Sequence, residues 1–440
     1  MEASTMPKQG RSVPLRRIAI PKLWVTFAGT AAVAWQCVTT GVAGEAQIEP
    51  NGSPAPVAPE RTIGDYLKPV VDIRGRYEYV DEDGLDDAWA ATLRARLGLM
   101  LENFGGFSAL AELEGTVPAD RHSYRAASAH GPASKAIIAD PESFELNQVW
   151  AAYSAFDTAA KGGRQRIILD NHRFVGNVGW RQNEQTFDAF TLSNSSIEDL
   201  TLYYGYIHRT NRIFGSQDRA AAAQSDFLGD TSLVNIRYTK WKGATLTIYG
   251  YWMDLENDAG ASESNRTLGL SLQGALSLDE AWKLPWHLEY ACQTDAFDSP
   301  LDYSAHYLHA VFGVDYKSAA FGAGFEVLSS DGDNGAFRTP LATLHKFNGF
   351  ADQFLTTPDE GLQDLYLYAA IPLPWQMQLR PAVHWFGDDD GSFDYGREID
   401  VELTKKVDDH LSFLAKYAYY DADEHKTDKH LFSIEFDCKF

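Results

Sequence analysis

The chain has little cysteine, few basic residues and no long apolar stretch beyond its N-terminal region. Only three cysteines occur in 440 residues, and only Cys292 and Cys438 lie beyond residue 44, so no disulfide framework is expected. No later run reaches the roughly 20 apolar residues that a membrane-spanning helix requires. Lys and Arg total 38 against 61 Asp and Glu, which argues against nucleic acid as a partner.

The N-terminal region has the layout of an export signal. Basic residues precede an apolar run over 23–38, and small residues continue to Gly44. This order predicts a cleavable secretory signal peptide over 1–44. Residues 45–67 are rich in Pro and Ala, which predicts a flexible periplasmic lead-in.

The other end of the chain alternates between apolar and polar residues up to its last position. Within 430–440, one parity carries Phe432, Ile434, Phe436, Cys438 and Phe440. Strict alternation suits a strand with one apolar and one polar face. A terminal strand that closes on Phe resembles the last strand of bacterial outer-membrane barrels, which implies recognition by the barrel assembly machinery through Phe440.

Alternating segments of similar length recur between these two ends, and aromatic residues make up 13% of the chain. Both features are typical of transmembrane barrels, whose aromatic side chains form girdles at the membrane interfaces. The predicted strands are 68–82, 89–103, 107–116, 144–156, 163–169, 187–194, 199–212, 231–240, 243–254, 265–278, 285–294, 303–316, 320–330, 363–371, 375–386, 397–406, 411–421 and 430–440.

The gaps between these segments give an independent test of the barrel hypothesis. Every second gap is a short turn, such as Asp157–Gly162, whereas the long gaps 117–143, 170–186, 213–230 and 331–362 all fall at the opposite end. A periplasmic all-β protein has no reason to segregate its loops by length. We therefore predict an all-β, antiparallel transmembrane barrel of about 18 strands over 68–440. It would lie in the bacterial outer membrane as a monomer, in contact with the lipid bilayer and lipopolysaccharide.

A barrel of this size is wide enough for an aqueous channel, and the parity of each strand assigns its residues to lipid or lumen. Arginine gathers on the predicted lumen side, and its planar fork captures carboxylates. Rings of arginine in a pore select anions. An alternative is that these arginines pair with Asp72, Glu78, Glu102 and Glu402 as ladders along the wall. The predicted inward arginines are Arg74, Arg76, Arg94, Arg96, Arg164, Arg166, Arg237 and Arg380.

Two stretches of the sequence resemble the alginate export family of outer-membrane β-barrel proteins. The first is 163–190, with Gly-Arg-Gln, Arg-Phe-Val-Gly, Trp-Arg-Gln-Asn and Thr-Phe-Asp in order, and the second is 339–358, running on to Tyr366. The resemblance implies an eighteen-stranded barrel whose arginine-rich constriction passes an anionic uronate polysaccharide outward. It also implies periplasmic export partners.

The first stretch carries the family's expected pore residues. By resemblance, Arg164 and Arg166 match the Gly-Arg-Gln strand, and Arg173 and Arg181 match a loop that folds toward the lumen. Trp180 beside Arg181 offers a stacking face next to a cation, which suits a sugar ring. A loop plug that stabilises the wall through Arg–Asp pairs is the alternative. Between these arginines lie Asp170 and Asn171.

These observations predict a passive channel for an anionic, alginate-like polysaccharide or a related carboxylated solute. We expect no catalytic residues, no metal and no cofactor, since no phosphate-binding glycine loop or Cys/His cluster occurs. Two alternatives remain open on the same barrel. One is a general or substrate-specific porin for small anions, and the other is a closed structural or adhesin-like barrel.

Overall fold

The computed structural model describes residues 62–127, 130–215, 225–257, 263–332 and 334–440. The predicted signal peptide and residues 45–61 of the lead-in lie outside these ranges and stay predictions. The described end of the lead-in holds a short 3-10 helix, η1 (Ile63–Tyr66). None of the described helices has the length and apolar character needed to span a bilayer.

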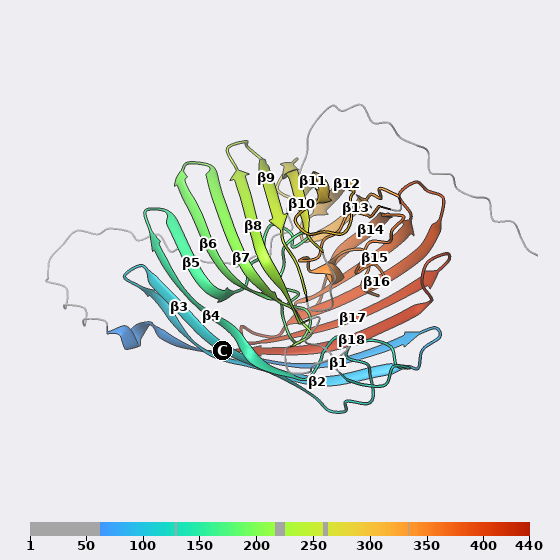
Figure 1. Ribbon diagram of the computed structural model, residues 1–440, viewed down its shortest axis with the longest axis horizontal. Helices are drawn as coiled ribbons and strands as arrows, with labels where there is room; N and C mark the ends of the chain where they lie inside the picture. The colour runs from blue at the N-terminus through green and yellow to red at the C-terminus, as the bar shows by residue number, and fades with distance from the viewer. Residues whose placement is uncertain (1–61, 128–129, 216–224, 258–262, 333) are drawn as a thin grey trace, which may run out of the picture. The chain divides into compact units, whose positions relative to one another are not determined.

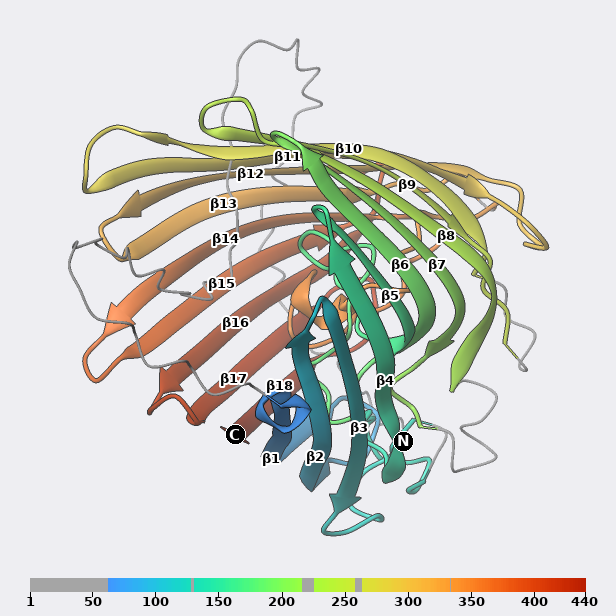
Figure 2. The ribbon, with the colours of Figure 1, turned by 90° about the vertical axis from the view of Figure 1, so that its left-hand side faces the viewer.

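The described chain forms one sheet of eighteen antiparallel strands, each hydrogen-bonded to its neighbours in sequence (Figures 1 and 2). The predicted barrel is confirmed. The strands are β1 (Leu67–Glu82), β2 (Ala88–Phe104), β3 (Phe107–Pro118), β4 (Ser143–Ala155), β5 (Thr158–Gln165), β6 (Thr186–Ile197), β7 (Leu200–Asn211), β8 (Asp226–Tyr238), β9 (Ala244–Met253), β10 (Asn265–Ser277), β11 (Trp282–Asp295), β12 (Ser304–Tyr316), β13 (Ala319–Leu328), β14 (Leu362–Leu373), β15 (Met377–Gly387), β16 (Asp394–Lys406), β17 (Leu411–Ala422) and β18 (Lys429–Lys439).

The sheet closes because β1 pairs with β18. Their register runs from Asp72 opposite Lys439 to Glu82 opposite Lys429. Beyond the last strand residue, the Phe440 N–H donates to the Val71 carbonyl at 2.8 Å. Closure is required in lipid, where an unpaired backbone group at a sheet edge finds no water to replace its partner.

Alternation along each strand separates an apolar outer face from a polar inner face. On β2, Leu93 and Leu97 are exposed outward, whereas Arg94 and Arg96 are buried inward. The same parity holds on β18, where Phe436 is exposed and Asp437 is buried. The predicted faces of these strands are confirmed. Both remaining cysteines are free thiols, and their registers with Leu268 and Ile73 place them on the outer face.

Most predicted strand bounds agree with the structure within three residues, but the strand predicted over 163–169 is wrong. The turn lies at Phe156–Asp157, which have φ of 52° and 55°, and β5 therefore begins at Thr158. The sequence signal misled because Gly162-Gly163 looks like a turn. Gly163 instead lies inside β5, where an added Cβ would approach the Val149 carbonyl oxygen to 2.3 Å.

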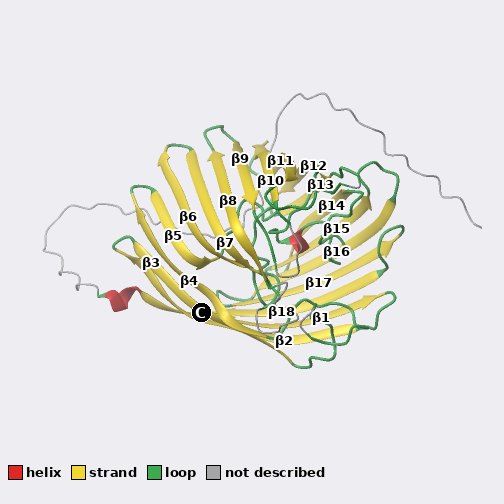
Figure 3. Cartoon of the chain, in the orientation of Figure 1, coloured by secondary structure: helices red, strands yellow, loops and turns green. Residues whose placement is uncertain are grey.

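Two of the long connections fold inside the ring of strands (Figure 3). We call residues 166–185 and 337–354 together the plug. The second segment contains the short helix η2 (Leu344–Lys346), and Val175 forms an isolated parallel bridge with Leu341. The two plug segments therefore hold one another as well as the wall.

We expect Leu97→Arg to destabilise the barrel by about 2–4 kcal/mol, because it places a cation on the outer face near the middle of β2. The matched control is Phe104→Arg, which lies beside the short turn at the end of the same strand and should cost about 0–1 kcal/mol. Denaturant unfolding in lipid vesicles, followed by tryptophan fluorescence, measures both. Equal costs for the two variants would contradict the assigned outer face.

Candidate functional site

Four buried arginines of β1 and β2 line the inner wall, and each pairs with a carboxylate. Arg74 Nε donates to Asp437 Oδ1 at 2.9 Å, and Arg76 pairs with Glu78. The remaining two pairs are Arg94–Asp72 and Arg96–Glu114. Farther round the ring, Arg380 pairs with Glu402 at 2.7 Å. The ladder alternative is therefore present in the structure, except that Glu102 is exposed.

The first plug segment is anchored to this arginine-bearing wall. Arg74 Nη1 donates to the carbonyl of Gly179 at 3.0 Å. Arg181 Nη1 donates to Glu78 Oε1 at 3.1 Å. These contacts are polar and buried, and the same segment also packs Phe174 against Tyr249 and Tyr307 of the wall.

The same segment reaches strands on the far side of the ring. Asp170 accepts hydrogen bonds from Asn235 at 2.8 Å and from Arg237 at 2.9 Å, both on β8. Arg173 Nε lies 2.9 Å from Glu326 Oε1 on β13. Since β8 and β13 lie across the sheet order from β1, residues 166–185 cross the interior.

The second plug segment completes the crossing through His345. This ring stacks on Trp180 with centroids 3.3 Å apart. Its Nδ1 lies 2.8 Å from Asp352 Oδ1, and its Nε2 lies 3.0 Å from Lys416 Nζ on β17. Arg181 Nη2 in turn lies 3.3 Å from Asp352. One connected network thus joins both plug segments to the wall.

Trp180 does not present a free stacking face in this arrangement. In addition to His345, the guanidinium carbons of Arg181 and Arg76 lie 3.9 Å and 4.4 Å from the centroid of its ring. Cations over an aromatic face are attracted by its quadrupole. The sequence predicts that Trp180 lies beside a cation, and the structure shows this contact. In the structure the ring packs within the plug and against the wall.

Arg164 was expected in the lumen, and the structure places it on the outer face. It is in register with Val149, which is exposed outward, while the adjacent Gln165 is buried inward. Arg164 Nε donates to Asp188 Oδ1 at 2.7 Å. Because β5 ends at Gln165, Arg166 leaves the alternation, turns inward and bonds Glu184 at 2.7 Å.

The remaining predicted residues lie in or against the plug. The Asn171 carbonyl accepts a hydrogen bond from Lys346 Nζ at 2.9 Å. Sequence reasoning missed Glu184, His345, Asp352 and Lys416, whose roles depend on contacts between segments far apart in the chain. Of the side chains described as buried, fourteen are Asp or Glu and eight are Arg or Lys, so the arginines offset an acidic interior.

Burial and neighbouring charges set the protonation of the plug network. Burial, together with Lys416, lowers the pKa of His345 to about 3, so its ring is neutral at pH 7. Burial alone would raise the pKa of Asp352, but His345 and Arg181 outweigh it and lower that pKa to about 2. The docked plug therefore contains a neutral imidazole and an ionised carboxylate.

A pocket of about 240 Å³ opens at the end of the barrel that carries the long loops. Arg173, Arg212 and Arg338 contribute three guanidinium groups to its lining. Its lining includes a single acidic residue, Glu263, whose pKa is raised by burial. Apolar side chains complete the wall, among them Phe214, Phe227, Leu328, Pro340, Leu344 and Phe354. The lining thus suits an anion that also carries an apolar or sugar-ring surface.

Residues 65–294, more than half of the chain, match the family model described as Alginate export. The chain belongs to the alginate export family. No curated protein matches this chain in sequence. Membership of this family and the closed barrel show that the chain is an integral protein of the bacterial outer membrane. Its architecture is that of a channel.

Solved structures of similar fold extend across nearly the whole barrel. OccAB4 of Acinetobacter baumannii shares 11% identity at a TM-score of 0.66, covering 85% of this chain and 98% of that one. OpdQ of Pseudomonas aeruginosa shares 15% identity at a TM-score of 0.64, and the match covers 85% of this chain and 98% of OpdQ. OccK9 (OpdG) of the same organism shares 14% identity at a TM-score of 0.64, and the match covers 86% of this chain and 99% of OccK9. At these identities the likeness shows the fold alone.

We expect Arg181→Ala to loosen the plug, because it leaves the buried carboxylates of Glu78 and Asp352 with fewer partners. Removing one member of a buried ion pair costs about 3–5 kcal/mol. Planar-bilayer recordings should show a larger conductance, and a protease added outside should cleave residues 166–185 faster. Arg237→Gln is the control, since its half-exposed pair with Asp170 is worth at most about 1 kcal/mol. Conductance that stays at the wild-type level in Arg181→Ala would refute this anchor.

We expect acid to release the plug. His345 has a folded pKa of about 3 against an ordinary value of 6.5, so the released state binds the proton more readily. The docked plug is then fully stable above about pH 6.5 and loses up to about 1.4 kcal/mol per pH unit as pH falls toward 3. Asp352 adds to this loss below its ordinary pKa of 3.8.

Conductance recorded at stepwise lower pH measures this release. His345→Gln should flatten the profile between about pH 6.5 and 4, because the titrating ring is gone. The exposed His306→Gln should leave the profile as in the wild type. A wild-type conductance that does not rise with acid would count against a plug held by neutral His345.

Proposed function

We propose that this protein is a passive channel for carboxylated sugars, an anionic polysaccharide such as alginate or a related uronate, and that it performs no covalent step. The observation that carries the proposal is the pocket at the long-loop end, where Arg173, Arg212 and Arg338 meet. Guanidinium groups bind carboxylates through two parallel hydrogen bonds. Its volume of about 240 Å³ suits a solute of about one sugar unit.

The way in which the plug is held supports a channel that opens. Besides the packing of Phe174 on the wall, its anchors include ion pairs and hydrogen bonds such as Arg181–Glu78 and Asp170–Arg237. Water can replace these polar contacts when the plug moves.

Arg173 links the pocket to the plug. It lines the pocket and at the same time pairs with Glu326 on β13 and with Asn348 in the second plug segment. A carboxylate that enters the pocket competes with Glu326 for this guanidinium. Binding of solute would therefore weaken one anchor of the plug. The inward arginines of β1 and β2 would then exchange partners with a passing anion at several weak sites, as transport requires.

The partners follow from the location of the barrel. Its outer face meets the lipid bilayer and lipopolysaccharide. We further propose that the C-terminal strand ending at Phe440 is recognised by the barrel assembly machinery, that the protein works as a monomer, and that a periplasmic partner delivers the polymer. A porin for small anions is the second candidate, because the pocket accommodates one small carboxylate.

We expect Arg338→Gln to weaken the apparent affinity for glucuronate about 10-fold, since one charge-assisted contact of about 1.4 kcal/mol is lost. Uptake of labelled glucuronate and of oligouronates into reconstituted vesicles measures this. Arg397→Gln is the matched control, because Arg397 is exposed on the outer face and pairs with Asp421.

The outcomes separate the candidate functions. Oligouronate passage that depends on Arg338 supports a polysaccharide channel, and passage of glucuronate alone supports the small-anion porin. Vesicles that admit neither solute would indicate a structural barrel. Equal glucuronate and glucose fluxes, both insensitive to Arg338→Gln, would remove the role of the pocket.

A further inference from the structure

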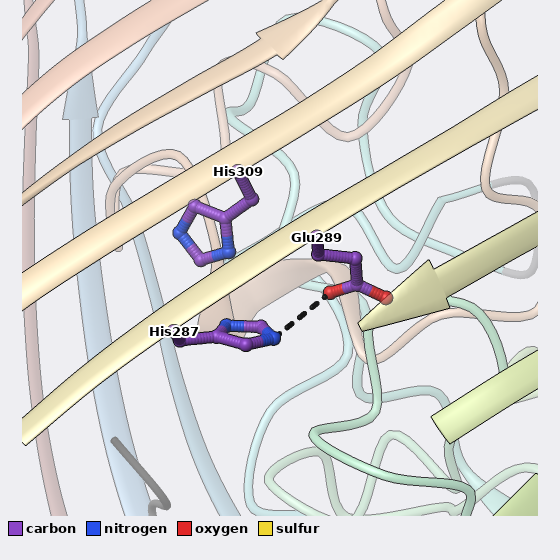
Figure 4. A group of neighbouring side chains, drawn as sticks. All are labelled: His287, Glu289 and His309. Atoms are coloured by element: carbon purple, nitrogen blue, oxygen red, sulfur yellow. Dashed lines mark ion pairs between the residues drawn. The ribbon is translucent and has the colours of Figure 1, made fainter. Parts of the chain in front are cut away.

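Two histidines and a glutamate meet on the inner wall, on the neighbouring strands β11 and β12. His287 and Glu289 are two residues apart on β11 and therefore face the same side of the sheet. His309 on β12 is in register with Glu289. All three residues are buried, and their side chains surround a common space (Figure 4).

The geometry of this trio is close to that of a metal-binding set. One ligand atom from each residue lies within 4.8 Å of the other two. His287 Nε2 and Glu289 Oε2 are 3.4 Å apart. Ligand bonds of about 2.0–2.2 Å in a tetrahedral site place neighbouring ligand atoms about 3.3 Å apart. Small side-chain rotations are sufficient to close the set around one ion.

Glu289 is one of the buried inner-wall carboxylates for which the described residues provide no arginine or lysine ion pair, as are Asp364 and Asp400, which pair with His384. Glu326 pairs with Arg173 and Glu402 with Arg380. Within the described ranges, the single ion-pair partner of Glu289 is His287. Burying a carboxylate is costly unless a cation or hydrogen bonds compensate for the lost water, and a divalent ion would supply that charge.

The surrounding hydroxyl groups orient two of the three ligands. The Tyr249 hydroxyl donates to Glu289 Oε1 at 2.8 Å. His309 Nε2 lies 2.9 Å from the Tyr366 hydroxyl. This arrangement leaves the buried Nδ1 of His309 without a hydrogen-bond partner. In known metal sites, a hydrogen bond to the ligand atom that does not bind the metal fixes the orientation of the ligand.

We propose that His287, Glu289 and His309 bind a divalent transition-metal ion, and that zinc is the ion they suit best. Two imidazole nitrogens and one carboxylate are a ligand set that zinc takes, with a fourth position left for water or a solute oxygen. Calcium and magnesium prefer all-oxygen sets of higher coordination number. The site does not depend on which solute passes through the barrel.

Zinc titration of the untagged, chelator-treated barrel in detergent tests the site at neutral pH. Isothermal titration calorimetry should show one zinc per barrel, and the bound zinc should raise the melting temperature. His309→Ala should weaken binding at least about 100-fold, and Tyr366→Phe should weaken it about 10-fold through the lost orienting contact. Magnesium should give no heat.

The matched control is His306→Ala, on the same strand but facing outward, where His306 stacks on Tyr290; it should bind zinc like the wild type. If His309→Ala fails to fold, Glu289→Gln and Tyr366→Phe carry the test. No saturable zinc binding by the folded wild type overturns the proposal. Binding that persists unchanged in Glu289→Gln, His309→Ala and Tyr366→Phe also overturns it, since the ion then sits elsewhere.

Discussion

The closure of β1 on β18 is the constraint on which the rest of this structure depends. A sheet in lipid cannot leave an open edge, because no water is present there to satisfy its N–H and C=O groups. Eleven residue pairs from Asp72–Lys439 to Glu82–Lys429 join the two ends of the chain. Once the ring is closed, every strand has an outside that meets lipid and an inside that does not. Side-chain alternation follows directly from this geometry.

A wide closed ring creates an interior that must be filled by both polar and apolar side chains. The chain fills this interior with its own loops and balances charge across the contact. Arg74 illustrates the principle, since it pairs with Asp437 on the adjacent strand and also donates to the backbone of the plug. The same guanidinium thus stabilises the wall and fixes the loop. A plug attached through such contacts is stable in place and still separable in water.

The plug also explains why an arginine-rich lumen need not be a positive one. Buried acidic residues outnumber buried basic ones, and most inward arginines already have carboxylate partners. In the pocket at the long-loop end, Arg173, Arg212 and Arg338 come from three separate chain segments and share the lining with one acidic residue.

The sequence by itself determined the barrel, its strand count, the inward side of most strands and the ends that carry short turns. It could do so because the period of two and the turn residues are local properties, read over about ten residues at a time. Only the tertiary structure decided that Arg164 lies on the outer face, that the ring of Trp180 is covered by His345 and arginines, and that His345 contacts Lys416. Those outcomes depend on where a strand stops and on which distant segments share the interior. Neither follows from local pattern, because a one-residue change in strand end reverses the side to which the next residue points.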